Sequence, residues 1–216
     1  MKIETSGIIL SVRPLGDSGA VVRALSRDRG VVCGFSYGAT GRKTKSRPMP
    51  GMFGRISWRA RLDTEMGSLS FETESNPAAA SNGRTATMVC SALELSDAFL
   101  ADGEINPAAY DILEKFLNNL SLVTNHLSLY IEWEISFLSC LGFAMDLSKC
   151  AMCGTTENLS FISPKTGRAA CDKCGGQFSD KLFPFPPSLE SMMFFLRRAS
   201  AEMDIKSLPA SRMILN

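Results

Sequence analysis

Residues 150–175 read CAMCGTTENLSFISPKTGRAACDKCG and contain two Cys-x-x-Cys pairs, each followed by glycine. The pairs are Cys150/Cys153 and Cys171/Cys174. Two such pairs at this separation are typical of a tetrahedral metal site with four thiolate ligands, and zinc is the expected ion. Since sulfur fills all four positions, none remains for a catalytic water, and we expect the metal to hold the fold together. A redox dithiol and four unrelated buried cysteines remain as alternatives, although the duplication argues against a redox pair.

The chain between the two pairs predicts a hairpin. Apolar runs at 159–162 and 168–170 flank the turn sequence Ser-Pro-Lys-Thr-Gly. We expect this hairpin to bring the pairs together in a zinc module that spans residues 148–180. Prolines 184, 186 and 187 then predict a stiff connector, and Ser188 is positioned to cap a last helix.

Short apolar runs separated by turn residues fill residues 3–75. We expect strands at 7–12, 20–25, 31–37, 52–61 and 67–72. Short strands in this number indicate a small barrel or a sandwich. The connection between the third and fourth strands, 38–51, contains the basic sequence GRKTKSRP, in which Gly, Ser and Pro disfavour regular structure.

Beyond a polar linker at 76–83, the apolar period changes to 3.6 residues. Three amphipathic helices are expected: one over 88–99, one that starts at the cap Asn106-Pro107, and one over 127–141. Their apolar stripes must pack against one another or against the barrel. The chain is therefore predicted to be an α+β protein of several domains.

Charge is divided unevenly along the chain, although its net value is only +1. Through Leu62 there are 12 basic and 3 acidic residues, against 11 basic and 19 acidic residues in the remainder. The basic N-terminal third is the candidate surface for a polyanion. The expected phosphate contacts are Arg42, Lys43, Lys45, Arg47, Arg55, Arg59 and Arg61. Four strand aromatics could stack on bases, although a core position is the commoner role for each: Phe35, Tyr37, Phe53 and Trp58.

Composition and motifs favour binding over catalysis. The one histidine, His126, lies in a predicted helix, where packing or surface roles prevail, and no P-loop, HExxH or GxSxG motif is present. No apolar run reaches the ~18 residues of a membrane span, and the N-terminus lacks the features of a secretory signal. Seven cysteines without an export signal predict a reducing cytoplasm. The chain ends without a helix stop signal, so we expect a short further C-terminal piece.

Segments at both ends of the chain carry a family likeness, in the same order. They are TSGIIL (5–10), RPLGDS (13–18), RGVV (29–32), Gly38-Ala39 with the basic connection, LGFAMDLSKC (141–150) and FISPKTGRA (161–169). On these residues the whole chain resembles the RecO family, the recombination mediators of bacterial DNA repair. The middle helices, 85–125, match only in pattern.

The resemblance implies an N-terminal five-stranded OB-fold β-barrel at residues 1–76. It implies an α-helical domain at 83–147 and 186–216, into which the four-cysteine zinc module is inserted. It also implies binding to single- and double-stranded DNA and annealing of complementary strands by a cytoplasmic, nucleoid-associated protein that is not an enzyme. The implied partners are RecR and the C-terminal tail of single-stranded DNA-binding protein, and indirectly RecA, which then loads on coated strands.

Three rival functions stay open on the residues alone. An RNA-binding or ribosome-associated factor could use the same barrel and zinc ribbon. A zinc-stabilised scaffold could carry a basic loop that binds nothing. A metalloenzyme would need a ligand other than cysteine or an open coordination position.

Overall fold

The computed structural model describes residues 2–39, 47–61 and 66–215. By its internal contacts the chain divides into two compact units. The first comprises Met1–His126 and Pro209–Ile214, and the second comprises Leu127–Leu208 and Leu215–Asn216. The domain boundaries expected from the sequence stay a prediction.

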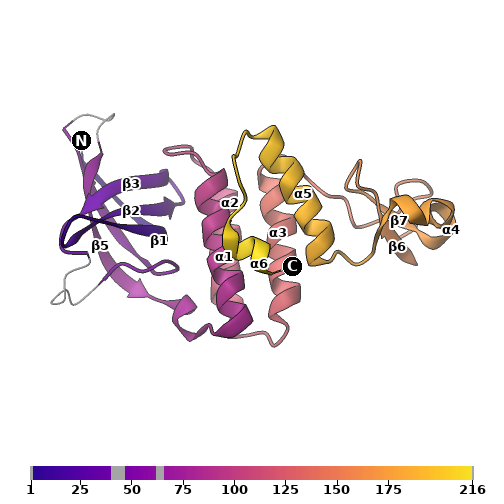
Figure 1. Cartoon of the computed structure of the whole chain (residues 1–216), viewed down its shortest axis with the longest axis horizontal. Coiled ribbons are helices and arrows are strands. Elements are labelled where there is room, and N and C mark those ends of the chain that lie inside the picture. Colours follow the sequence, from indigo (N-terminus) through magenta and orange to yellow (C-terminus); the bar gives the residue numbers. More distant parts are fainter. Residues whose placement is uncertain (1, 40–46, 62–65, 216) are drawn as a thin grey trace. The chain divides into compact units, whose positions relative to one another are not determined.

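The first unit contains a closed barrel of five strands: β1 (Lys2–Leu15), β2 (Gly19–Ser26), β3 (Gly30–Ser36), β4 (Phe53–Arg59) and β5 (Gly67–Ser75) (Figure 1). The order around the barrel is β1-β2-β3-β5-β4, and the sheet closes where β4 pairs with β1. All neighbours are antiparallel except β3 and β5, which pair in parallel through Gly34 and Phe35. Five strands in this order form an OB-fold, and the predicted barrel is confirmed.

The barrel core follows the alternation of the strands. Its fully buried members include Ile9, Val22 and Ile56, and Trp58 completes it at 7% exposure. The indole Nε1 of Trp58 donates to the carbonyl oxygen of Cys33 at 2.9 Å, so its one polar atom is satisfied. Gly67 faces this ring so closely that a Cβ there would clash with it. Trp58 is therefore a core residue and has no free face for a base.

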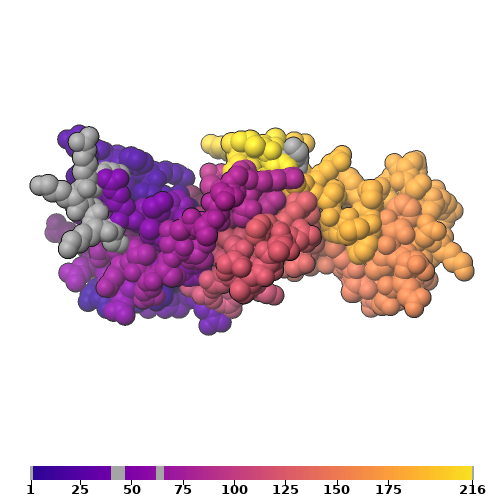
Figure 2. Space-filling view, turned by 90° about the horizontal axis from the view of Figure 1, so that it is seen from below, coloured from indigo at the N-terminus to yellow at the C-terminus, as the bar shows by residue number. Residues whose placement is uncertain are grey.

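Three helices of the first unit follow the barrel: α1 (Gly83–Phe99), α2 (Pro107–Asn119) and α6 (Ala210–Ile214), with a 3-10 turn at Pro77–Ala80. The predicted cap of α2 is confirmed, because Asn106 Oδ1 accepts from the Ala109 amide at 3.0 Å. The expectation that the helix after Ser188 is the last one is wrong, since α6 follows it and packs on α1 (Figures 1 and 2). Ser211 Oγ ties α6 to Glu94 at 2.6 Å.

Arginines of the barrel form ion pairs with aspartates in α1, just after α1 and in α2. Arg23 Nε lies 2.5 Å from Asp97 Oδ1, and its Nη1 lies 2.5 Å from Asp102. Both side chains of the first pair are largely buried, at 18% and 9% exposure. The pairing joins residues more than 70 positions apart and fixes α1 against the outer face of β2.

Two more barrel arginines point to the same helices. Arg13 Nη2 lies 3.2 Å from Asp97 Oδ2. Arg27 donates two hydrogen bonds to the Asp111 carboxylate, from Nε at 2.7 Å and from Nη2 at 3.1 Å. The expectation that the whole basic third faces an external polyanion is therefore corrected. Part of the uneven charge along the chain is neutralised inside the first unit.

The second unit combines α3 (His126–Cys140), α5 (Leu189–Glu202) and a small sheet ordered β7-β6-β8. Its strands are β6 (Leu159–Ile162), β7 (Ala169–Cys171) and β8 (Phe183–Pro184), with α4 (Asp172–Gly175) and a 3-10 helix at Gly176–Lys181. The hairpin of β6 and β7 is confirmed. The expected proline connector instead contributes β8, an edge strand, which is a position that tolerates proline.

The start of α5 agrees with the sequence. Ser188 caps the helix, and its side chain and that of Ser191 exchange bonds with each other's backbone amides at 3.3 and 2.9 Å. Among the described residues, no helix is both long enough and apolar enough to cross a membrane.

Replacing Asp97 tests the ion pairs that hold α1. We expect Asp97→Asn to lower the free energy of unfolding by about 1.5–3 kcal/mol, because the largely buried Arg23 loses a charged partner. The control is Asp111→Asn, whose pair with Arg27 is exposed and whose loss should cost less than about 1 kcal/mol. Urea denaturation of both variants measures the difference. Equal effects would contradict the assignment.

Candidate functional site

The two Cys-x-x-Cys pairs meet in one cluster. The Sγ atoms of Cys150, Cys153, Cys171 and Cys174 all lie within 4.8 Å of one another. Cys153 Sγ and Cys171 Sγ, from different pairs, are 3.7 Å apart. Four sulfurs at metal–sulfur bonds of ~2.3 Å in a tetrahedron stand about 3.8 Å apart, so the cluster has the dimensions of a metal site. The donor set is all thiol, which suits a structural ion.

The backbone around the cluster explains the two glycines. Gly154 has a φ of +77°, and its amide donates to the Cys150 carbonyl at 2.9 Å, which closes the first turn. Gly175 serves a different purpose, because a Cβ there would lie 2.6 Å from the ring of Phe161. The amide of Ala151 bonds the carbonyl of Ala169 at 2.8 Å and joins the first pair to β7. Each pair is thus held by local backbone geometry.

The electrostatics of the cluster call for a cation. Amides of Cys153, Cys171 and Met152 donate to the Cys150 sulfur and lower the pKa of its thiol to about 6. The neighbouring sulfurs of Cys171 and Cys153 raise the pKa of Cys174 to about 12. One thiolate forms readily, but four cannot coexist at this spacing without a positive ion between them. A divalent metal removes that conflict.

The other three cysteines lie outside the cluster. Burial raises the pKa of Cys140 to about 11, and its Sγ contacts the Phe137 carbonyl oxygen at 3.0 Å. Cys33 is half-buried, in keeping with a packing role. Cys90 is exposed, although an isolated cysteine is more often a small buried residue.

The predicted phosphate contacts divide into two groups. Arg42, Lys43 and Lys45 lie outside the described residues. Arg47, Arg55, Arg59 and Arg61 are all exposed. Arg55 and Arg59 stand two residues either side of Ser57 on the outer face of β4, opposite the core residues Ile56 and Trp58. Their role in binding stays a prediction.

Neighbouring strands show what surrounds Arg55 and Arg59. On the neighbouring strand β1, Lys2 lies opposite Arg59 and Glu4 lies opposite Ser57. On the other neighbour, β5, Glu72 lies opposite Arg55. Lys2 forms an ion pair with Glu4, and together with Arg59 and Arg55 it lowers the pKa of that carboxyl. This face is therefore mixed in charge, with the cations in excess along β4.

The aromatic candidates also separate. Phe53 and Trp58 belong to buried positions, at 9% and 7% exposure. Tyr37 is 80% exposed, and Phe35 packs edge-on against it with ring centroids 4.6 Å apart. Tyr37 follows the end of β3 and directly precedes the basic connection. Of the four candidates, Tyr37 offers the ring that is most accessible for stacking.

His126 has a structural role in the first unit. One ring nitrogen bonds Thr85 Oγ1 at 3.0 Å, and the other lies 3.0 Å from the Leu120 carbonyl. Both nitrogens are thus used to join the start of α3 to α1 and to the end of α2. The expected packing role fits these contacts.

A closed OB barrel followed by helices and a four-cysteine cluster defines a class of multidomain proteins with an oligonucleotide-binding fold and a structural metal site. Two sequence-family models match the chain. One is described as Recombination protein O N terminal and covers residues 1–76, and the other as Recombination protein O C terminal and covers residues 80–214. Together they cover both compact units.

Curated relatives agree with the family models. The chain is 35% identical to the DNA repair protein RecO of Gluconacetobacter diazotrophicus over 194 residues. The aligned residues make up 87% of this chain and 76% of the relative. It is 37% identical to RecO of Dinoroseobacter shibae, over 83% of this chain and 76% of the relative. It is 33% identical to RecO of Caulobacter vibrioides (strain NA1000 / CB15N), over 96% of this chain and 84% of the relative. The chain belongs to the RecO family of DNA repair proteins.

Removing one thiol tests the metal site. We expect Cys171→Ser to lose bound metal and to lower the melting temperature, because three thiols lack the fourth ligand that closes the tetrahedron. The control Cys90→Ser changes an exposed thiol outside the cluster and should keep the metal. Elemental analysis of the purified proteins gives the metal content per chain. Equal metal content in both variants would refute the site.

Proposed function

We propose that this protein is a DNA-binding recombination mediator that binds single- and double-stranded DNA, anneals complementary strands and promotes loading of RecA on coated single strands. The observation that carries the proposal is the outer face of the OB barrel, where Arg55 and Arg59 are exposed and Tyr37 presents its ring. Membership of a DNA repair family supports DNA as the polyanion.

The chemistry of the barrel face suits a flexible strand. Arginine side chains on β4 neutralise phosphates and release counterions, which supplies affinity without reading sequence. The exposed ring of Tyr37, after the end of β3, offers a stacking platform that accepts any base. Arg42, Lys43, Lys45, Arg47 and Arg61 would extend the cationic surface along the connection and the end of β4.

Annealing then requires no covalent step. Two strands repel each other through their phosphates, and cations on the protein reduce that repulsion while the bases pair. The protein thereby acts as a binding surface and not as an enzyme.

We propose Zn²⁺ as the ion of the four-cysteine cluster, with Cys150, Cys153, Cys171 and Cys174 as its ligands. Four thiolates in tetrahedral spacing favour this ion over harder divalent cations, which prefer oxygen. When bound, zinc cross-links the turn before β6 to β7 and α4. Its contribution is stability of the second unit.

The partner proteins follow from family membership. We propose RecR, the C-terminal tail of single-stranded DNA-binding protein and, indirectly, RecA, with all of these meeting the protein on DNA in the cytoplasm. An RNA-binding or ribosome-associated role is the alternative. Affinity for structured RNA well above that for single-stranded DNA would favour it.

Salt dependence tests the cationic surface. Changing Arg42, Lys43, Lys45 and Arg47 to Ala should flatten the plot of log affinity against log salt, by about 0.7 for each single-strand phosphate that the variant no longer neutralises. The matched control is Arg27→Gln, because that arginine is paired with Asp111. Fluorescence anisotropy with labelled oligothymidylate measures the slopes. An unchanged slope in the quadruple variant would remove the connection from the proposal.

A second substitution tests stacking. Tyr37→Ala should weaken binding to single-stranded DNA by about 1–3 kcal/mol, the contribution of one base stacked on an aromatic ring. Tyr37→Phe keeps the ring and should bind as the parent does. Duplex DNA, whose bases are already stacked, should be little affected. Equal losses in the Ala and Phe variants would show that the hydroxyl, and not the ring, matters.

A further inference from the structure

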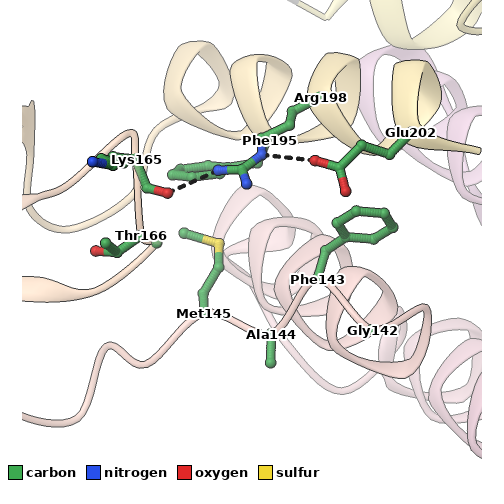
Figure 3. Close-up of a pocket in the computed structure, with 10 residues that line it drawn as sticks. Gly142, Phe143, Ala144, Met145, Lys165, Thr166, Phe195, Arg198 and Glu202 are labelled. Atoms are coloured by element: carbon green, nitrogen blue, oxygen red, sulfur yellow. Dashed lines mark hydrogen bonds and ion pairs between the residues drawn. The ribbon is translucent and has the colours of Figure 1, made fainter.

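A cavity of about 240 Å³ in the second unit is used by none of the sites above. It opens between α5, the segment that follows α3 (residues 142–145) and the turn between β6 and β7 (residues 165–167) (Figure 3). All three segments belong to one compact unit, so the cavity does not depend on how the two units are placed.

Part of the cavity wall is apolar. In the segment after α3, Met145 points toward Phe195 on α5, and the ring of Phe143 lies nearer Glu202 (Figure 3). Phe195 is 7% exposed, whereas Phe143 and Met145 are half-buried. A flat aromatic or apolar group of a ligand would find a ring and a thioether to pack against.

A fixed cation stands at the mouth. Arg198 Nε donates to Glu202 at 3.0 Å, and its Nη1 donates to the carbonyl oxygen of Lys165 at 2.8 Å (Figure 3). These two bonds orient the guanidinium and leave its Nη2 group available to a ligand. The exposed Lys165 side chain points away from Arg198 (Figure 3). Glu202 occupies one side of the guanidinium, so a negative group of a ligand would meet Arg198 at Nη2.

The backbone around the cavity offers little to an extended peptide. The Lys165 carbonyl is taken by Arg198, the Gly167 amide by the Ser163 carbonyl at 2.8 Å, and the Thr166 amide by Ser163 Oγ. Strand β6 is paired on both sides, by β7 and β8, so it has no free edge here. A peptide that binds by strand addition needs such an edge. Recognition at this site is left to side chains.

We propose that this cavity binds one nucleotide of a DNA strand, with the base against Phe143 and the phosphate on Arg198. A nucleotide joins the required chemistry in one ligand: a flat apolar face for the ring and an anion for the guanidinium. The proposal rests on the proposed DNA-binding function and adds a second strand contact, in a unit separate from the barrel. Annealing gains from it, because each unit can then hold a strand of its own.

The test is a local signal in the full-length protein. With ¹³C-methyl-labelled methionine, the Met145 resonance is assigned through Met145→Leu and followed during titration with 5′-phosphorylated tetrathymidylate. The signal should shift, and Phe143→Ala should weaken the titration about 10-fold, as loss of one stacking ring does. Phe143→Leu, which keeps apolar volume but removes the ring, should weaken it as well. Arg198→Gln should weaken it further at low salt, while Arg197→Gln, the neighbouring exposed arginine that does not line the cavity, should leave it unchanged.

Different failures are distinguishable. If the Met145 signal stays still while long single-stranded DNA binds, the cavity assignment is overturned and the proposed function stands. If no DNA binds at all, both are overturned. If an acidic peptide such as hexaglutamate moves the Met145 signal and displaces the oligonucleotide, the cavity is a peptide site and the assignment is again overturned.

Discussion

The ion pairs of Arg23 with Asp97 and Asp102 are the constraint on which the electrostatics of this protein depend. They lie where β2 meets the helices, at distances of 2.5 Å, and the Arg23 side chain is largely buried. A charged group buried this far must keep its partner, so this arginine cannot turn outward to a ligand. The pairs thereby limit which cations of the basic N-terminal third remain for DNA. Arg55 and Arg59 on β4 are exposed.

The segment that carries the four clustered thiols has little apolar core. Strands of two to four residues and short turns bury little apolar surface, and around Cys150 the apolar cluster contains only a few of the described residues. A metal bonded by the four thiolates would replace the missing core. The turn between β6 and β7 also contacts α5, because its Lys165 carbonyl accepts from Arg198.

Local patterns were sufficient to predict much of the fold and the thiol cluster. The strands of the barrel, the Asn106 and Ser188 caps and the hairpin all depend on neighbours within a few residues, and the structure has them where the patterns place them. The two Cys-x-x-Cys pairs carry their spacing with them. Features that depend on contacts between distant parts of the chain could not be predicted from the sequence. The pairing of Arg23 with Asp97 spans 74 positions, and nothing near either residue indicates it. Strand β8 was missed because its proline argues against a strand, and α6 because five residues show no period.

Hydrogen–deuterium exchange with and without single-stranded DNA tests the central claim most directly, namely that intramolecular ion pairs leave the β4 side of the barrel as the DNA surface. We expect slower amide exchange in β3, in β4 and in the segment after Tyr37 when DNA is bound, with little change in α1 and α2. Slower exchange centred on α1, α2 and the β2–β3 turn that carries Arg27, with β4 unchanged, would contradict that claim.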